Sequence, residues 1–306
     1  MKKKIIFSIL LFILAGAGIF FAYKVFVNIG KINIAAVLSE KKRQAWLGLE
    51  KTINGDITGF KGTVGIVIKD LDTGRKITFN ENALMPSASL VKIPVMLSCF
   101  YAERDGKISL KDTVSLKGSE RVAGSKMLGD FPPGSKFTVE ALFEPMITQS
   151  DNTAANMLID LIGFDALNAY FKTMGLQHTN IRRNMMDFKE RKAGGENYTT
   201  AADMAYLLEK LYRNKFLDKK TSERCLALLG EQKINDRIPR KLPKGDIFIA
   251  HKTGLERCVC HDVGIVFTKK GNFLICVLVK HEEKRAQSSK KLIADIALAT
   301  YNYYQN

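Results

Sequence analysis

The sequence predicts a mixed α/β protein of the α+β type, in which one antiparallel sheet is flanked by helices and a separate lobe is all-helical. Apolar and polar residues alternate as in strands at 63–68 and 75–79, and again at 247–254, 263–268 and 273–279. A long block of helical patterns separates the two groups of strands. The two ends of the chain can therefore contribute to one sheet, with the middle helices as a second lobe.

Each element has its own local signal. The turn Leu71-Asp72-Thr73-Gly74 joins the two early strands. A helix is predicted over residues 89–103, with Ile93, Val95, Met96 and Phe100 as its apolar members. Pro94 falls in about its first turn, where proline is tolerated. Residues 105–137 are rich in Gly, Pro, Ser and Lys and predict loops with short pieces of structure, and residues 177–198 predict a polar loop. Further helices are predicted for residues 39–51, 140–146, 153–162, 165–174, 199–213, 222–231 and 287–304.

The N-terminus predicts a membrane segment. Three lysines precede an uncharged apolar run of 19 residues, Ile5–Tyr23, which as a helix would span about 28 Å, close to one hydrocarbon core. Ala15-Gly16-Ala17 would suit signal cleavage, but the apolar run continues past it, which favours an uncleaved anchor. We expect residues 1–23 to be an anchor or signal segment, 24–37 a linker and 38–306 the folded domain. The lysines place that domain outside the cytoplasm, on the membrane if uncleaved and secreted if cleaved.

The composition limits the classes of partner and cofactor that can be expected. Lys plus Arg is 47 and Asp plus Glu is 31, which gives a formal charge of +16 and suits an anionic neighbourhood. The basic residues are scattered and no nucleic-acid motif accompanies them, so we expect no nucleic-acid partner. We also expect the chain to be a monomer. Five cysteines guarantee at least one free thiol per monomer, unless it pairs between chains. No metal-ligand spacing is present, so no metal or cofactor is expected.

The stretch Ser89-Leu90-Val91-Lys92 places a hydroxyl and an amine on one face of a helix start. A serine hydroxyl is a weak nucleophile that needs a nearby base, and a lysine that loses its proton easily can be that base. The first N–H groups of the helix can hold a developing oxyanion. Alone, S-x-x-K is a weak signal, since Ser89 could simply cap a helix while Lys92 is solvated.

Two later motifs change that interpretation. Ser150-Asp151-Asn152 and Lys252-Thr253-Gly254 each occur once, in this order. S-x-x-K, S-D-N and K-T-G together are typical of class A β-lactamases and penicillin-binding proteins. The chain therefore resembles the class A β-lactamase-like serine hydrolase family over roughly residues 40 to 304, which implies a β-lactamase/transpeptidase-like fold.

The resemblance implies a role for each motif residue. Ser89 would be the nucleophile, Lys92 its general base, and Ser150 the relay that passes a proton to the leaving nitrogen. Lys252 would supply positive charge for the substrate carboxylate. The substrate would also be bound by Asn152, which steadies Lys92 as well, by the Thr253 hydroxyl, and by the strand at Gly254 and Leu255. The oxyanion hole would use the N–H of Ser89 and that of Leu255 or Glu256.

Other polar residues near the motifs are expected to be structural. Asp151 would cap the following helix. His251 and His261 flank the K-T-G strand, but no Ser–His–Asp order includes them.

The sequence departs from the family pattern where the acyl-enzyme would be hydrolysed. Family members carry a loop glutamate that activates the deacylating water. If Arg183 is the loop arginine, that glutamate position holds Met185 and the companion amide position holds Lys189. The position of the loop's closing acid holds Asn197, so the usual ion pair with Arg183 is expected to become at best a hydrogen bond. Asp187, then Glu190, are the candidate replacement bases. The substrate-binding arginine of the strand after K-T-G is also missing: Cys260 stands near its place, with Arg257 as a candidate substitute.

Three functions remain at this stage. The first is a serine β-lactamase-family hydrolase, acting on β-lactam amide bonds through an acyl-enzyme on Ser89, with deacylation in doubt. The second is a penicillin-binding-type D-alanyl-D-alanine carboxypeptidase or transpeptidase acting on D-alanyl peptides. The third is a non-catalytic β-lactam sensor, which ranks last because only residues 1–4 would lie in the cytoplasm to carry an output.

Overall fold

The computed structural model describes residues 20–21, 23–24, 37, 39–283 and 285–305. The chain divides into two compact units, residues 1–52 and 53–306. The helix predicted for residues 39–51 is longer in the structure, where residues 39–58 are helical. Among the described residues, no helix has both the length and the apolar character that a membrane span requires. The predicted segment 1–23 and the predicted linker 24–37 lie almost entirely outside the described residues.

The second unit contains the antiparallel sheet that the sequence predicts, with the strand order β2-β1-β9-β8-β7. Its strands come from the two ends of the chain: β1 (Gly62–Asp70), β2 (Lys76–Phe79), β7 (Phe248–Glu256), β8 (Val259–Thr268) and β9 (Gly271–His281). β9 joins the two groups of strands, because its residue Val279 pairs with Val64 on β1 and with Cys260 on β8. The predicted fold class is confirmed.

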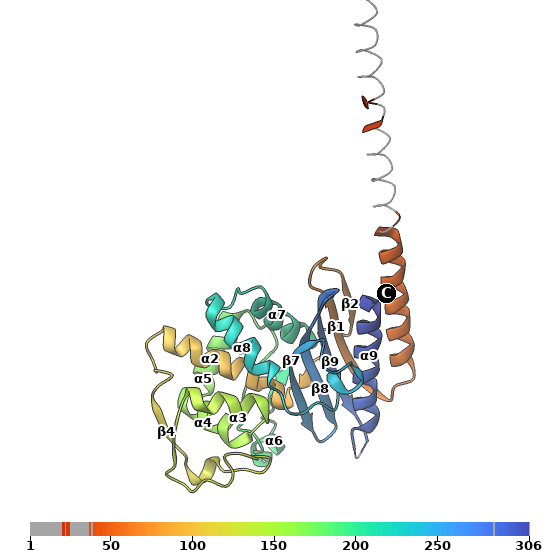
Figure 1. The fold of residues 1–306 in the computed structure, drawn as a ribbon. Helices are drawn as coiled ribbons and strands as arrows, with labels where there is room; N and C mark the ends of the chain where they lie inside the picture. Colours follow the sequence, from red (N-terminus) through yellow and green to blue (C-terminus); the bar gives the residue numbers. More distant parts are fainter. Residues whose placement is uncertain (1–19, 22, 25–36, 38, 284, 306) are drawn as a thin grey trace, which may run out of the picture. The chain divides into compact units, whose positions relative to one another are not determined.

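The helices lie on the two sides of this sheet (Figure 1). The C-terminal helix α9 (Gln287–Gln305) packs on β8 and β9, and α7 (Ala201–Tyr212) contacts β1, β8 and β9. The helical lobe is built around α2 (Lys92–Arg104), which is buried from Lys92 to Ala102. Around α2 are α3 (Phe143–Thr148), α4 (Asn152–Ile162), α5 (Phe164–Met174) and α8 (Lys219–Gly230). A helix enclosed on all sides reads as continuously apolar, which explains why its sequence shows no polar face.

Short elements connect these layers. They are the two-stranded ribbons β3 (Met85–Pro86) with β6 (Tyr198–Thr199) and β4 (Thr113–Ser115) with β5 (Lys136–Thr138), and the 3₁₀ turns η1 (Ala88–Val91), η2 (Gly118–Glu120), η3 (Glu140–Leu142) and η4 (Ile238–Lys241). The segment predicted as a loop over 177–198 also contains a short helix, α6 (Phe188–Lys192). Its five residues are too few to show a helical period, but Asp187 caps it by accepting a hydrogen bond from the N–H of Glu190 at 3.0 Å.

Candidate active site

Ser89 lies in the turn η1, directly before α2, and its side chain is partly exposed. The residue before it, Ala88, has a positive φ of 45°, a backbone conformation that costs a non-glycine residue about 1–3 kcal/mol and persists only where the surroundings impose it. The first N–H groups of a helix have no acceptor within the helix. The N–H of Ser89 is therefore available to an oxygen placed beside its hydroxyl.

Lys92 is fully buried one turn after Ser89 and reaches the second motif. Its Nζ donates to the carbonyl oxygen of Ser150 at 2.6 Å and to Oδ1 of Asn152 at 2.7 Å, and lies 3.4 Å from Oγ of Ser150. A neutral amine has two N–H bonds and one lone pair. The two short bonds use both donors, which leaves the lone pair free to accept a proton.

The third motif joins the same cluster. Lys252 on β7 is also fully buried, and its Nζ donates to Oγ of Ser150 at 2.9 Å and to the carbonyl oxygen of Thr253 at 3.2 Å. The Ser150 hydroxyl therefore lies between two lysine amines. All three motifs, separated by up to 160 residues of sequence, meet at this hydroxyl.

Burial sets the charge of both lysines. It lowers the pKa of the Lys92 ammonium to about 7, although the carboxylates of Asp151 and Glu256 oppose the change. Burial, together with the charge of Lys92, brings the pKa of Lys252 well below its ordinary value. Two ammonium groups that share one hydroxyl in a buried site repel each other. One amine of the pair can therefore be neutral near pH 7, as a lysine base requires.

The start of α4 holds the S-D-N residues in place. Ser150 has a positive φ of 61°, a second strained position beside the lysines. Asp151 caps α4 as predicted: its Oδ1 accepts from the N–H of Ala154 at 3.0 Å, and its Oδ2 accepts from the N–H groups of Met127 and Leu128. The amide nitrogen of Asn152 donates to the carbonyl of Ala123 at 2.9 Å, which directs its oxygen to Lys92.

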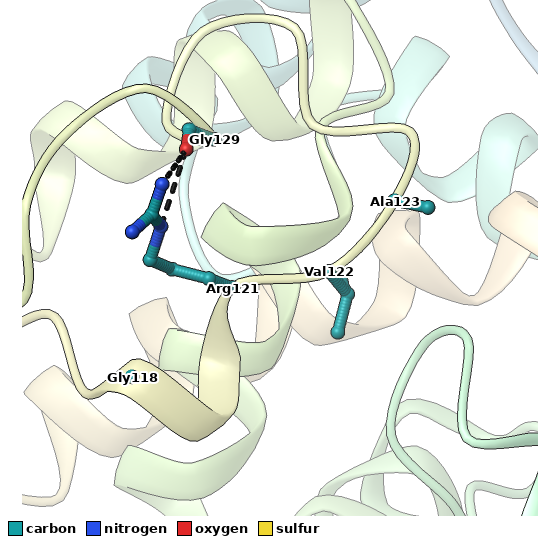
Figure 2. A pocket seen from close by; sticks show the side chains of 5 residues that line it. All are labelled: Gly118, Arg121, Val122, Ala123 and Gly129. Atoms are coloured by element: carbon teal, nitrogen blue, oxygen red, sulfur yellow. Dashed lines mark hydrogen bonds between the residues drawn. The ribbon is translucent and has the colours of Figure 1, made fainter.

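A pocket of about 430 Å³ borders this cluster in the loop of residues 118–129. Gly118, Arg121, Val122, Ala123 and Gly129 line it, and Figure 2 shows the Arg121 guanidinium folded onto the carbonyl of Gly129, to which it donates at 2.6 Å. Ala123 is the same residue whose carbonyl binds Asn152. One residue of the pocket lining is therefore hydrogen-bonded to the S-D-N motif.

β7 forms the edge of the sheet beside Ser89, because no strand follows it in the strand order. An edge strand leaves every second backbone N–H and C=O without a strand partner. Gly254 allows the close approach, since a Cβ there would lie 3.2 Å from the His261 ring and 3.3 Å from Leu90. Thr253 is buried, whereas the Leu255 side chain is 49% exposed.

The two histidines are structural. His261 accepts from the N–H of Val279 at Nδ1, so its Nε2 carries the proton and donates to the carbonyl of Pro86 at 2.8 Å. Burial lowers the pKa of His261 to about 4, so this ring is neutral at pH 7. It ties the turn before Ser89 to β8. His251 bonds Asp262 at 2.9 Å and Asn235 at 3.1 Å.

The loop residue predicted to replace the deacylating glutamate lies against the same helix as Asn152. Met185 is buried, and its backbone is gripped by Asn156, which accepts from its N–H at 2.7 Å and donates to its carbonyl at 3.2 Å. Asn156 follows Asn152 by one helical turn on α4. Of the candidate replacement bases, Asp187 caps α6 and Glu190 is exposed, and neither has a hydrogen bond to a motif residue.

The prediction that Arg183 loses its ion pair is wrong. Its guanidinium lies 2.7 Å from Glu196 and 3.0 Å from Glu256. Asn197 instead holds the backbone, accepting from the N–H groups of Arg182 and Arg183 and donating to the carbonyl of Arg183 at 3.0 Å. The acid stands one residue before the position expected from the sequence, and the second acid comes from β7.

An arginine that the sequence interpretation did not single out lies beside Cys260. Arg237, 1% exposed, directs its Nε to the sulfur of Cys260 at 3.2 Å, and its charge contributes to the lowered pKa of Lys252. Burial raises the pKa of the Cys260 thiol, so this sulfur is uncharged at pH 7. Arg237 therefore brings a guanidinium next to Cys260, although β8, the strand after K-T-G, carries no arginine there. The only sequence signal was an arginine immediately before the Ile238-Pro239 turn.

Comparison with known proteins agrees with this arrangement. The Beta-lactamase enzyme family matches residues 48–304. The chain belongs to this family. The β-lactamase VEB-1 of Pseudomonas aeruginosa is 26% identical over 257 residues, which cover 79% of this chain and 86% of that protein. The chain is thus a serine hydrolase of the class A β-lactamase-like family, as the three motifs predicted.

Solved structures of the family have the same fold. PBP-A superposes with a TM-score of 0.77 and 28% identity, covering 84% of this chain and 96% of that one. A PBP-A variant in which glutamate replaces a leucine was solved as an acyl-enzyme complex with penicillin G. A β-lactamase from Sphaerobacter thermophilus gives a TM-score of 0.76 and 30% identity, covering 85% and 98%.

The described part of the chain contains no group of three or more His, Cys, Asp or Glu side chains arranged to hold a metal ion. All five cysteines are free, and Cys258 is the one that is not buried.

Proposed function

We propose that this protein is a serine β-lactamase-family hydrolase that opens the β-lactam amide bond through an acyl-enzyme on Ser89. The observation that carries the proposal is the chain of contacts from Lys92, one helical turn after Ser89, to Ser150 and on to Lys252. A base, a proton relay and a cation are the groups that amide acylation requires around a serine.

The reaction follows from the positions of these groups. Neutral Lys92 accepts the proton of Ser89 as its oxygen attacks the β-lactam carbonyl. The N–H groups of Ser89 and of Leu255 or Glu256 stabilise the oxyanion. The C–N bond then breaks, and Ser150 passes a proton to the ring nitrogen and is reprotonated from a neighbouring lysine. The substrate carboxylate binds Lys252 and the Thr253 hydroxyl, with Arg237 as the nearby second cation in place of the missing strand arginine.

Hydrolysis of the acyl-enzyme is the slow half of the cycle in this proposal. Met185 occupies the position from which family members activate water, and a thioether cannot accept a proton at neutral pH. Two hydrogen bonds between the Asn156 side chain and the Met185 backbone support that assignment, because they hold residue 185 against the helix that carries Asn152. A positioned general base is worth about 10²–10⁴ in rate, so its loss lengthens the life of the acyl-enzyme accordingly.

Met185 also favours a second candidate, a penicillin-binding-type carboxypeptidase or transpeptidase that acts on D-alanyl peptides. A transpeptidase passes its acyl group to an amine and has no need of a water-activating carboxylate. The two candidates share Ser89, Lys92 and Ser150 and differ in the substrate and in the fate of the acyl-enzyme, which a transpeptidase passes to an amine and a carboxypeptidase to water. Release of D-alanine from a D-alanyl-D-alanine peptide, without turnover of β-lactams, would establish the second.

The location of the enzyme is part of the proposal. The apolar run behind three lysines would hold the catalytic domain, residues 38–306, on the outer face of the cytoplasmic membrane as a monomer. Both β-lactams and wall peptides are encountered on that side.

A fluorescent penicillin tests the proposal. It should label the wild-type protein, fail to label Ser89→Ala, and still label Ser87→Ala, whose hydroxyl only makes a 3.4 Å contact with the carbonyl of Ala88. Equal labelling of wild type and Ser89→Ala would exclude Ser89 as the nucleophile.

A further inference from the structure

One loop, residues 182–197, contacts both backbone segments that carry the proposed oxyanion donors: the turn before Ser89 and the end of β7. On the nucleophile side, the N–H of Ser87, two residues before Ser89, donates to the carbonyl of Asn197 at 2.7 Å. The Asn197 side chain in turn binds the backbone of Arg183 through both its oxygen and its nitrogen. The turn that carries Ser89 is therefore fixed to the loop at Arg183.

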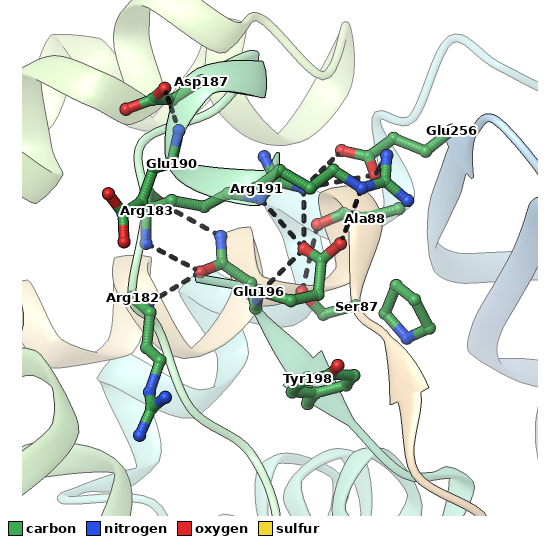
Figure 3. A network of polar contacts seen from close by, with 12 residues as sticks. Ser87, Ala88, Arg182, Arg183, Asp187, Glu190, Arg191, Glu196, Tyr198 and Glu256 are labelled. Atoms are coloured by element: carbon green, nitrogen blue, oxygen red, sulfur yellow. Dashed lines mark hydrogen bonds and ion pairs between the residues drawn. The ribbon is translucent and has the colours of Figure 1, made fainter. Parts of the chain in front are cut away.

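On the strand side, the contact is made by charged side chains. Arg183 donates to the Glu256 carboxylate at 3.0 and 3.2 Å, and Arg191 from α6 donates to it at 3.1 Å. Glu196 closes the cluster, lying 2.7 Å from Arg183 and 3.0 Å from Arg191. Figure 3 shows the two guanidinium groups between the two carboxylates.

This cluster is balanced and largely removed from water. It contains two positive and two negative groups, and the side chains of Arg183, Glu196 and Glu256 are 1%, 9% and 9% exposed. Paired Arg–carboxylate contacts are strong and strict in geometry, and removal of one partner leaves an uncompensated buried charge. The Glu256 carboxylate is therefore held firmly relative to the loop.

The contacts of Glu256 with Arg183 and Arg191 lie at the end of β7 that supplies the proposed strand donor. Glu256 is the last residue of β7, and the strand N–H proposed to bind the substrate oxygen belongs to Leu255 or to Glu256 itself. β7 is an edge strand, so no further strand fixes its outer side. The side-chain contacts of Glu256 take the place of that missing strand at the end of β7 that supplies the strand donor.

We infer that Glu256 is a positioning residue whose carboxylate, bound by Arg183 and Arg191, sets the distance between the two oxyanion donors of the site. The inference rests on the proposed acylation of Ser89. The inference links the loop that carries Met185 to the acylation step, because this loop contacts both the turn before Ser89 and the end of β7. A displacement of about 1 Å in such a site can cost up to 10²-fold in rate.

Two substitutions of the full-length protein separate this role from mere stability. Glu256→Gln and Glu196→Gln each remove one charge from the same cluster, at two carboxylates with the same 9% exposure. Acylation by a fluorescent penicillin should be timed at pH 9, where Lys92 is neutral in every variant, because the charge of Glu256 also acts on the pKa of Lys92. Both variants should melt at a lower temperature. Glu256→Gln should acylate ten- to a hundredfold more slowly, and Glu196→Gln within about threefold of wild type.

A second pair of substitutions covers the case in which Glu256→Gln does not fold. Arg191 is 28% exposed, so its replacement is easier to tolerate. Arg191→Gln removes one partner of Glu256 and should slow acylation severalfold. Lys192→Gln, the same charge change at the neighbouring exposed residue of α6, should leave the rate unchanged.

The outcomes separate the inference from the proposed function. If wild type takes up no penicillin, the proposed function itself fails. If wild type is acylated and Glu256→Gln keeps its rate, or loses no more than Glu196→Gln does, Glu256 only stabilises the fold and the inference is wrong. In the second pair, equal rates for Arg191→Gln and Lys192→Gln would overturn it in the same way.

Discussion

The pH dependence of acylation reports directly on the Lys92 amine. Its pKa is lowered to about 7 by burial, against about 10.4 for a lysine in water. At pH 7 about half of the Lys92 amines are then neutral, whereas an ordinary lysine would be neutral in roughly one molecule in 2,500. Burial therefore increases the fraction of competent base by about a thousandfold.

The sign of the effect follows from the role of a base. The amine must be unprotonated to accept the proton of Ser89, so the acylation rate is high above the pKa and falls as the pH drops below it. Between pH 9 and pH 5 the rate should fall about a hundredfold, with a midpoint near 7. Rapid-mixing measurements of labelling by a fluorescent penicillin, at fixed ionic strength, give this curve.

The contribution of Lys92 to folding stability also increases with pH. The folded state binds the Lys92 proton less tightly than the unfolded chain does, so the contribution of Lys92 to stability rises with pH between about 7 and 10.4. Circular dichroism across the pH range confirms that the protein is folded wherever a rate is measured. A rate that does not change between pH 5 and 9 in folded protein, or a midpoint above pH 9, would refute Lys92 as the neutral base.

Three further predictions test other parts of the site. Met185→Glu should speed release of the acyl group by up to about 10²-fold, measured as loss of label over time, and an unchanged release rate would mean that residue 185 does not face the deacylating water. Gly254→Ala should slow acylation severalfold, because its Cβ would lie 3.2–3.3 Å from the buried side chains of His261 and Leu90 and would push them aside; full activity would show that this contact does not position the Ser89 turn. Cell fractionation should recover full-length protein in the membrane, accessible to protease from outside, whereas a shortened soluble protein would show that residues 1–23 are a cleaved signal.

The sheet and the motif cluster were predictable because each depends on patterns that the sequence states locally. Alternation over residues 63–68 and 273–279 predicts two strands, and three short motifs single out Ser89, Lys92 and Lys252 as candidates. That Lys92 and Lys252 meet at Ser150 could be expected only from the family likeness, since these residues lie far apart in the chain.

The loop could not be predicted to the same degree. The acid that pairs with Arg183 was placed at Asn197, although a shift of one residue gives Glu196. The second acid, Glu256, is 73 residues away, and no local pattern connects it to the loop. Arg237 was missed for the same reason, because its contact with Cys260 bridges 23 residues between a turn and a strand. Contacts between long side chains from separate elements are fixed by tertiary packing and have no periodic signature.

Time-resolved mass spectrometry of the full-length protein mixed with penicillin tests the central claim most directly. The account predicts that the protein gains the mass of one intact penicillin, that the peptide containing Ser89 carries it, and that the adduct is lost slowly. Absence of the adduct at every time point, or its presence on the Ser89→Ala variant, would contradict the claim that Ser89 is the acylated nucleophile.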